Sequence, residues 1–446
     1  MASLEVVYEE VDTGDRMPCT LARTGSTNSI IMDTSLVKHL RIASETADIY
    51  ENSFAEENSR IEALNMARKI VAKLETPEEV VLRYGWEIGS HRMALRVGID
   101  LGLFRMLSEK FGEPVSAEQL ADQSEAETPP RLHFSIFDSD KYATVRIMRV
   151  LSATGFVTEL GVRLYTANML TNAIATPALQ AATKILHDNS ALVEMRLHEY
   201  FRIHGYKCPT EETNCAFQWT FNTSLTYFQR IHSTPETLGD FNTFMAGYRN
   251  KRKHWIDWFP VETEVLSNFF RADSTANILI VDVGGGKGHD LERFLARFPQ
   301  SAGHLVLQDV PKTISTLNGL TPGIKAMGHD FFTPQPIKGA RIYYTHDVLH
   351  DWPDNKCREI LRYLKSAMQP GYSKIYLNET ILPDIGCSSY WAAGDINMMA
   401  ILAAKKRTRL EWIELIESVG MNCVRIWKSP YLNDEEGIIE VMLQQE

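Results

Sequence analysis

A run of apolar residues that ends in a glycine cluster limits, more than any other feature, what this chain can fold into. Residues 278–283 read Ile-Leu-Ile-Val-Asp-Val, and glycines follow at 284, 285, 286 and 288. A run that is apolar on both faces is typical of a strand buried in a parallel sheet. Glycines let the backbone bend sharply into the next helix, predicted at 290–298. Strand, glycine turn and helix in this order predict an α/β fold.

The same alternation of strands and helices continues to the end of the chain. A helix over 354–368 ends before Pro370, and Thr408 with Glu411 forms a capping box for another helix that closes at Gly420. The remaining strands are predicted at 305–309, 341–344, 374–377, 423–427 and 438–443. Because these strands are apolar and separated by helices, we expect a parallel sheet covered on both sides.

The amino-terminal half reads differently and is mainly helical. Residues 1–55 lack periodicity and are expected to form a mobile or loosely docked extension. Residues 57–110 repeat apolar positions at helical spacing, and two helices and a short hairpin around Gly161 then suggest a winged-helix arrangement. We therefore expect an extension at 1–55, a winged-helix domain at 56–235 and an α/β domain at 236–446.

Composition excludes several classes of partner. The formal net charge of −11 argues against a nucleic-acid partner, so a structural or dimer-forming role is favoured for the winged-helix region. No apolar run approaches the roughly 20 residues that cross a bilayer, and no secretory signal is apparent. The six cysteines form no CxxC pair, so no metal site is predicted. A cytoplasmic protein is the expectation.

The glycine loop differs from the common phosphate-binding motifs. A dinucleotide fingerprint places its third glycine where this chain has His289, and a Walker loop places Ser or Thr where this chain has Gly288. Asp282, directly before the glycines, suits a cationic ligand better than a pyrophosphate. Together with Gly284, Gly285 and Gly286 it is a candidate cofactor-binding residue.

Acidic residues at the ends of the next two strands fit a nucleoside. Asp309 can accept both hydroxyls of a ribose, although a turn cap is the alternative. Asp330 can bind an adenine amino group while Phe331 covers the ring, the alternative being a plain turn with a core phenylalanine. The three positions together indicate a nucleoside-bearing cofactor.

His350 is the candidate catalytic base. It lies between a strand end and a helix, on the edge where open α/β sheets bind ligands. An imidazole titrates near 6.5 and can assist a phenol that titrates near 10. Glu379, at the neighbouring strand end, could hold the ring, as a carboxylate orients a base elsewhere. The alternatives are a helix-cap histidine and a surface glutamate.

Apolar and aromatic side chains fit an apolar acceptor. Their spacing is helical, so an ordinary core is the alternative reading. They are Phe241, Phe244, Met245, Met398 and Met399.

These motifs resemble the S-adenosylmethionine-dependent small-molecule O-methyltransferases of the plant caffeic-acid type and their fungal secondary-metabolism relatives. The resemblance covers roughly residues 80–445 and rests on the glycine loop, the strand-end acids and the segments 349–352, 379–383 and 405–408. It implies a Rossmann-like seven-stranded methyltransferase sheet preceded by a winged-helix dimerisation domain, and a homodimer.

Residue roles follow from the resemblance. It implies S-adenosylmethionine at Gly284, Asp309, Asp330 and Phe331, His350 as the base and Glu379 as its flanking carboxylate. Asp395 and Met398 match a segment of the substrate pocket wall.

Two positions depart from the family pattern. His346 stands where the family usually has Lys or Arg in contact with the adenine side of the cofactor, and Lys406 stands where a second acidic residue is often found. The second departure weakens the expectation of a pair of carboxylates around His350.

Two rival functions stay open at this point. Some fungal relatives keep the cofactor but guide pericyclic or dehydration steps on polyketide-like substrates, and the departure at Lys406 keeps that reading open. A non-catalytic winged-helix binding protein is the other rival, and the intact glycine loop and acidic balance count against it. Formation of S-adenosylhomocysteine would discriminate a methyltransferase from both.

Overall fold

The structure is a computed structural model, and it describes the chain over most of its length. The described residues are 38, 40–42, 44, 45, 57–127, 141–250, 253–267, 269, 278–317, 319–431 and 434–444. Contacts divide the chain into two compact units, residues 1–90 with 431–433 and residues 91–430 with 434–446. The extension expected at 1–55 lies almost wholly outside the described residues, and the domain boundaries at 55 and 235 stay a prediction.

The first unit is helical over its described residues. It contains α2 (Glu57–Leu74), α3 (Pro77–Leu82), the π-helix η1 (Arg83–Glu87) and the start of α4 (Ile88–Asp100). Thr76 begins α3 because its hydroxyl accepts the backbone N–H of Glu79, whose carboxylate in turn accepts the N–H of Thr76. Several large apolar side chains of this unit are exposed, among them Tyr84 and Trp86.

The second unit begins with helices around a small sheet. The sheet is antiparallel with the strand order β1-β3-β2. Its elements are α5 (Leu103–Ser108), β1 (Val115–Ser116), α6 (Ala117–Glu127), α7 (Lys141–Ala153), β2 (Thr158–Gly161) and β3 (Leu164–Thr166). Two helices followed by a hairpin agree with the expected order of elements, and Ser116 and Gln119 form a capping box at the start of α6. The winged-helix assignment itself stays a prediction.

A run of helices leads from the small sheet to the large one. The α-helices within residues 177–250 share a core with α17 (Ser389–Leu402), which belongs to the later part of the chain. The helices of the run are α8 (Met169–Ile174), α9 (Pro177–Ile185), η3 (Leu186–Ala191), α10 (Leu192–His204), α11 (Ala216–Phe221), α12 (Tyr227–Ile231) and α13 (Pro235–Asn250). No helix within the described ranges combines the length and apolarity that a bilayer crossing needs.

The large sheet carries the predicted glycine motif near its centre. Its strand order is β10-β11-β8-β7-β4-β5-β6, and a short strand, β9, extends the edge of β8. The strands are β4 (Ile280–Val283), β5 (Leu305–Asp309), β6 (Ile324–Gly328), β7 (Ile342–His346), β8 (Lys374–Leu382), β9 (Arg407–Thr408), β10 (Met421–Lys428) and β11 (Glu436–Leu443). The seven side-by-side strands are the number that the resemblance implied.

The expectation of a wholly parallel sheet is wrong at one edge. Strands β4 to β8 are parallel, but β11 runs antiparallel to β8 and to β10. The physical reason is the short connection between β10 and β11, which makes them a hairpin. Because β11 inserts between β8 and β10, it is buried almost throughout, like a parallel strand.

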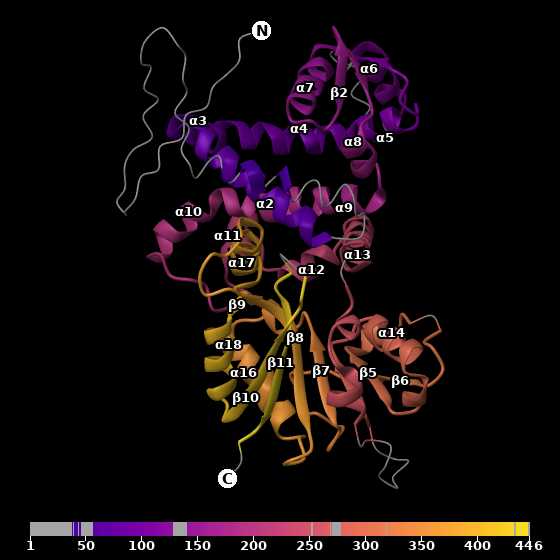
Figure 1. Ribbon diagram of the computed structural model, residues 1–446, viewed down its shortest axis with the longest axis vertical. Coiled ribbons are helices and arrows are strands. Elements are labelled where there is room, and N and C mark those ends of the chain that lie inside the picture. The colour runs from indigo at the N-terminus through magenta and orange to yellow at the C-terminus, as the bar shows by residue number, and fades with distance from the viewer. Residues whose placement is uncertain are drawn as a thin grey trace. The chain divides into compact units, whose positions relative to one another are not determined.

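Helices cover both faces of the large sheet. On one face, α16 (Asp354–Lys365) and α18 (Arg409–Glu417) pack on inward residues such as Val281 and Ile375. On the other face, α14 (His289–Arg297) and η4 (Trp255–Asp257) pack on Ile280 and its neighbours. Figure 1 shows α16 and α18 beside β10 and β11, and α14 beside β5. Alternate residues of each strand therefore serve two cores.

The turn after β7 is fixed by a buried arginine. This turn is the 3-10 helix η8 (Leu349–Asp351), which contains His350. Arg407 is fully buried, and its guanidinium donates to the carbonyls of Leu349 and Trp352 at 3.2 and 3.1 Å. The same guanidinium donates to Asp354 at 2.7 Å, at the first turn of α16. One side chain thus joins the turn that contains His350 to the helix that follows.

We expect Arg407→Met to lower the free energy of unfolding by about 3 kcal/mol, because it leaves buried carbonyls without a donor and removes the partner of Asp354. Urea unfolding followed by tryptophan fluorescence measures the change. Arg202→Met, at an exposed arginine of α10, is the control and should be nearly neutral. Equal stability of the two variants would show that the buried arginine does not hold the turn.

Candidate active site

The glycine loop between β4 and α14 has the backbone that glycine favours. Gly284, Gly286 and Gly288 have φ values of +77°, +60° and +83°, in the left-handed region. A side chain on Gly285 would collide with the carboxylate of Asp282, whereas nothing lies within 4 Å of the place where a Cβ of Gly286 would stand. The loop is therefore tight on its inner side and open at Gly286, where a ligand can approach the backbone.

Asp309 lies against this loop at the end of the neighbouring strand. Its Oδ2 accepts the N–H of Gly286 at 2.9 Å, and its Oδ1 accepts the N–H of Val310 at 2.8 Å. The carboxylate thus caps its own turn, as the alternative reading proposed, and also faces the glycine loop. Asp282 is different, because its side chain is buried beneath the loop with 1% exposure.

Phe331 also meets the glycine loop, whereas Asp330 is exposed. The ring edge of Phe331 lies 3.5 Å from the place where a Cβ of Gly284 would stand. Asp330 Oδ1 accepts the N–H of Phe332 at 3.0 Å and so fixes the turn after β6. The loop, Asp309 and Phe331 lie together at the carboxyl ends of β4, β5 and β6, and these residues make up the candidate cofactor seat. Open glycine backbone, a carboxylate that can accept from ribose hydroxyls and an aromatic ring that can cover a base are groups that suit a nucleoside-bearing cofactor.

His346 lies in a buried network of charges behind the glycine loop. Its Nδ1 donates to Asp290 Oδ2 at 2.6 Å, and Asp290 Oδ1 accepts from His254 Nε2 at 3.0 Å. Its Nε2 faces Asp347 and Glu436 at 3.8 and 3.9 Å. Burial opposes the charged ring, but the carboxylates, Asp290 above all, outweigh it and raise the pKa of His346 to about 10. Both ring nitrogens therefore have carboxylate partners.

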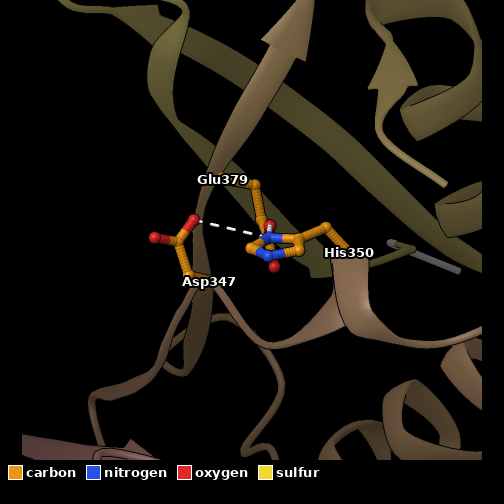
Figure 2. A group of neighbouring side chains, drawn as sticks. All are labelled: Asp347, His350 and Glu379. Atoms are coloured by element: carbon orange, nitrogen blue, oxygen red, sulfur yellow. Dashed lines mark hydrogen bonds and ion pairs between the residues drawn. The ribbon is translucent and has the colours of Figure 1, made fainter. Parts of the chain in front are cut away.

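The His350 ring is held by Glu379 (Figure 2). Nδ1 of His350 donates to Glu379 Oε2 at 2.9 Å, and Glu379 Oε1 accepts the N–H groups of Val348 and Leu349 at 3.1 and 2.7 Å. Glu379 is completely buried, so it is not a surface residue. Since a carboxylate only accepts, the proton lies on Nδ1 and the lone pair of a neutral ring lies on Nε2. Nε2 is the atom that can take a proton.

Two further carboxylates flank the His350 ring. Asp347 Oδ1 lies 3.4 Å from Nδ1, and Asp351 Oδ1 lies 3.3 Å from Nε2. Burial opposes the charged imidazole, but Asp351 and Glu379 outweigh it, so the pKa of His350 stands above its ordinary value. Burial raises the pKa of Asp351 to about 6. His350 is therefore more basic than an ordinary histidine, and both of its ring nitrogens have carboxylate neighbours.

Three of these side chains also have metal-like spacing. Asp347, His350 and Glu379 each place one ligand atom within 4.8 Å of the others (Figure 2). Each of these ligand atoms already serves the internal network, because Glu379 accepts three N–H groups and His350 Nδ1 donates to it. A metal ion bound to these atoms would have to displace the hydrogen bond from His350 Nδ1 to Glu379, which orients the His350 ring.

The predicted acceptor-side residues lie on two helices. Phe244 and Met398 are partly buried against the helical core, and Met399 is buried within it. Met245, next to Phe244 on α13, is half-buried. Asp395 Oδ1 accepts the backbone N–H of Lys406 at 2.8 Å, and α17, which carries Asp395, contacts the turn η8. Met399 matches the core reading, whereas α17 as a whole borders the catalytic turn.

Sequence reasoning missed several residues of the site. Asp347 and Asp351 lie in the same sequence motif as His350. Their closeness to the candidate base in the sequence was the only signal that could have identified them. Asp290, the partner of His346, lies 56 residues before it in the chain. His254, the other partner of Asp290, lies 36 residues before Asp290. No local pattern signals such partners.

A pH dependence of stability follows from His346. Its folded-state pKa of about 10 lies above the unfolded value near 6.5, so its contribution is full below about pH 6.5 and is lost as pH rises through about 10. In urea titrations between about pH 7 and 9.5, wild type should lose stability more steeply than His346→Gln. His198→Gln, at an exposed histidine, should keep the wild-type slope. Equal slopes in all three proteins would contradict a charged His346.

Comparisons with known proteins agree with this geometry. The family model of the O-methyltransferase domain matches residues 210–422. The chain is 37% identical over 392 residues to methyltransferase cfoC of Aspergillus candidus, covering 88% of this chain and 92% of that one. It is 33% identical over 362 residues to demethylsterigmatocystin 6-O-methyltransferase of Aspergillus parasiticus, covering 81% and 87%.

A solved structure extends the likeness to the fold. The structure of LepI in complex with SAM has a TM-score of 0.76 and 26% identity, and the match covers 92% of this chain and 100% of that one. The seat of glycine backbone, carboxylate and aromatic ring has the donor set for that cofactor. The chain therefore belongs to the O-methyltransferase family and is an S-adenosylmethionine-dependent O-methyltransferase.

Proposed function

We propose that this enzyme methylates a phenolic or enolic hydroxyl of a small apolar metabolite, with His350 as general base and Glu379 as the carboxylate that holds it. The observation that carries the proposal is the orientation of the His350 ring. Its Nδ1 is engaged by buried Glu379, so the acceptor is proposed to meet Nε2, on the side where Asp351 Oδ1 also lies, 3.3 Å from that nitrogen. The relative named for 6-O-methylation of demethylsterigmatocystin supports a small hydroxyl acceptor of this kind.

The cofactor seat and the base are neighbours. A methyl group of Val348, two residues before His350, lies 3.0 Å from the place where a Cβ of Gly284 would stand. S-adenosylmethionine, when bound, supplies an electrophilic methyl carbon. We infer that Gly284, Gly285 and Gly286 provide the open backbone, while Asp309 binds the ribose and Phe331 covers the adenine.

The other cofactor-side residues support the seat in different ways. Asp330, exposed at the turn after β6, is proposed to meet the adenine amino group. Buried Asp282 is proposed to act on the cationic part of the cofactor from beneath the loop. His346 is proposed to act indirectly, because its ring holds Asp290 in the first turn of α14, directly behind the loop.

The protein contributes to this reaction by removing a proton and by aligning the reacting atoms. His350 Nε2 takes the proton of the acceptor hydroxyl as the oxygen bonds to the methyl carbon and the carbon–sulfur bond breaks. Glu379 stabilises the imidazolium that forms. A phenol titrates near 10, so this assistance is worth about 10²- to 10⁴-fold. Alignment of oxygen, carbon and sulfur supplies the rest.

The acceptor is proposed to lie on the α13 and α17 side of the base. Phe244, Met245, Met398 and Met399 would provide apolar surface, and Asp395 would fix the end of α17 through the backbone of Lys406. The contact between α17 and η8 supports this location.

Incubation with methyl-labelled cofactor and a panel of phenols and enols tests the function. We expect a labelled methyl ether and S-adenosylhomocysteine in equal amounts, and a loss of about 10²-fold or more in His350→Ala with cofactor affinity retained. Asp309→Ala, the matched contrast, should lose cofactor affinity instead. Product without S-adenosylhomocysteine would favour the pericyclic or dehydration reading, and wild-type turnover by His350→Ala would remove His350 from the base role.

We also propose a cytoplasmic homodimer joined through the first unit. Support comes from exposed apolar side chains within residues 57–90: Val71, Leu74, Val81, Leu82, Tyr84 and Trp86, each 48% exposed or more. Large exposed apolar side chains gathered in one short segment are typical of a protein interface. The five cysteines in the described part of the chain are free thiols, which agrees with a reducing compartment.

Sedimentation velocity tests the assembly. Wild type should sediment as a dimer, and Tyr84→Ser combined with Trp86→Ser should shift it toward the monomer. Tyr206→Ser, at a tyrosine 76% exposed in the second unit, is the control and should leave the dimer intact. A wild-type monomer at micromolar concentration would refute the dimer.

A further inference from the structure

Lys406 extends its ammonium group beside the catalytic turn. Its Nζ donates to Thr380 Oγ1 at 3.2 Å, one residue after Glu379, and lies 5.5 Å from the ring centroid of Trp391. Its backbone N–H is held by Asp395. A Cβ on Gly394 would stand 3.3 Å from Lys406 Cε, so the glycine gives the long side chain room against α17. The position of the ammonium is therefore fixed by the fold.

The basic residues on either side of Lys406 have carboxylate partners, whereas Lys406 has none nearby in the described part of the chain. Lys405 pairs with Asp354 and Glu411, and Arg407 pairs with Asp354. In the described part of the chain, no carboxylate lies within 4.0 Å of Lys406 Nζ. Its charge nevertheless opposes the rise in the pKa of both His350 and Asp351. Lys406 is thus a cation of the site that no close ion pair neutralises.

Without a nearby cation, the carboxylates around His350 would disfavour an acceptor that becomes negatively charged. Asp347, Asp351 and Glu379 all lie within 3.4 Å of the His350 ring. Negative charge that develops on an acceptor oxygen beside them is repelled, and the repulsion is strong where water is excluded. A cation on the acceptor side offsets this. Thr380 occupies one N–H of the ammonium, which leaves two donors for an acceptor.

We propose that Lys406 binds the acceptor and selects hydroxyls conjugated to a neighbouring carbonyl, such as enols of 1,3-dicarbonyls and aromatic hydroxyls beside a ketone. The inference rests on the proposed function of this site. As the hydroxyl proton moves to His350 Nε2, conjugation carries negative charge onto the carbonyl oxygen, where the ammonium donates to it. A phenol without that carbonyl leaves the ammonium unused and places its charge beside the carboxylates. The acidic residue often found at this position in the family could not make this interaction.

Two measurements test the proposal, and the first needs no acceptor. The ring of His350 is titrated by NMR in protein labelled on histidine, with its signal assigned by its loss in His350→Gln. Lys406→Met should raise the pKa of His350, Lys406→Glu should raise it further, and Lys406→Arg should restore it. Lys338→Met, at an exposed lysine, is the control and should change nothing. An unchanged titration in Lys406→Met would place the ammonium too far from the base and overturn the proposal.

The second measurement compares kcat/KM for 1-hydroxyanthraquinone, whose hydroxyl adjoins a carbonyl, and 2-hydroxyanthraquinone, whose hydroxyl does not. Wild type should prefer the first isomer, and Lys406→Met should lose that preference at least tenfold while Lys406→Arg keeps most of it. A preference that survives in Lys406→Met, or turnover of the second isomer alone, would overturn the assigned acceptor class. If no hydroxyl compound at all is methylated, the failure belongs to the proposed function, and the NMR titration still decides where Lys406 acts.

Discussion

The site depends on one buried carboxylate, that of Glu379. It lies in β8, where water cannot solvate it, and an unpaired charge there would be strongly unfavourable. Three N–H groups satisfy it, from Val348, Leu349 and the His350 ring. All three belong to the turn after β7, the strand next to β8. Because one of the three donors is Nδ1 of His350, the bonds that satisfy the buried charge also set the orientation of the His350 ring.

Parallel strands bring the chemistry to one edge without any long-range design in the sequence. Because β4, β5, β7 and β8 run in the same direction, whatever follows each of them meets at their carboxyl ends. For this reason the glycine loop, Asp309, His350 and Glu379 could be assigned from the sequence as one site. The same logic failed for β11, since nothing in residues 438–443 distinguishes a buried antiparallel strand from a parallel one.

Sequence patterns predicted the local structure, whereas contacts between residues far apart in the chain became known only from the structure. The capping boxes at Ser116 and Thr408 and the left-handed glycines depend on neighbours within a few residues, so their spacing was sufficient. The pairing of His346 with Asp290 depends on how α14 packs against β7, and no spacing encodes that. Likewise Lys406 could be read as a departure from a family pattern, but its hydrogen bond to Thr380 could not.

Two histidines four positions apart show how surroundings decide the role of a residue. His346 is hydrogen-bonded to Asp290 and faces two more carboxylates, so it is a fixed cation that holds the first turn of α14. His350 also has carboxylates around its ring, and they raise its pKa, but the charge of Lys406 opposes that effect. Asp347 touches both rings, and its φ of +55° is a conformation that costs roughly 1 kcal/mol outside glycine. Such a strained residue persists only where its neighbours hold it. His346 is one of these neighbours, so Asp347 connects the charge network at the start of α14 to the His350 ring.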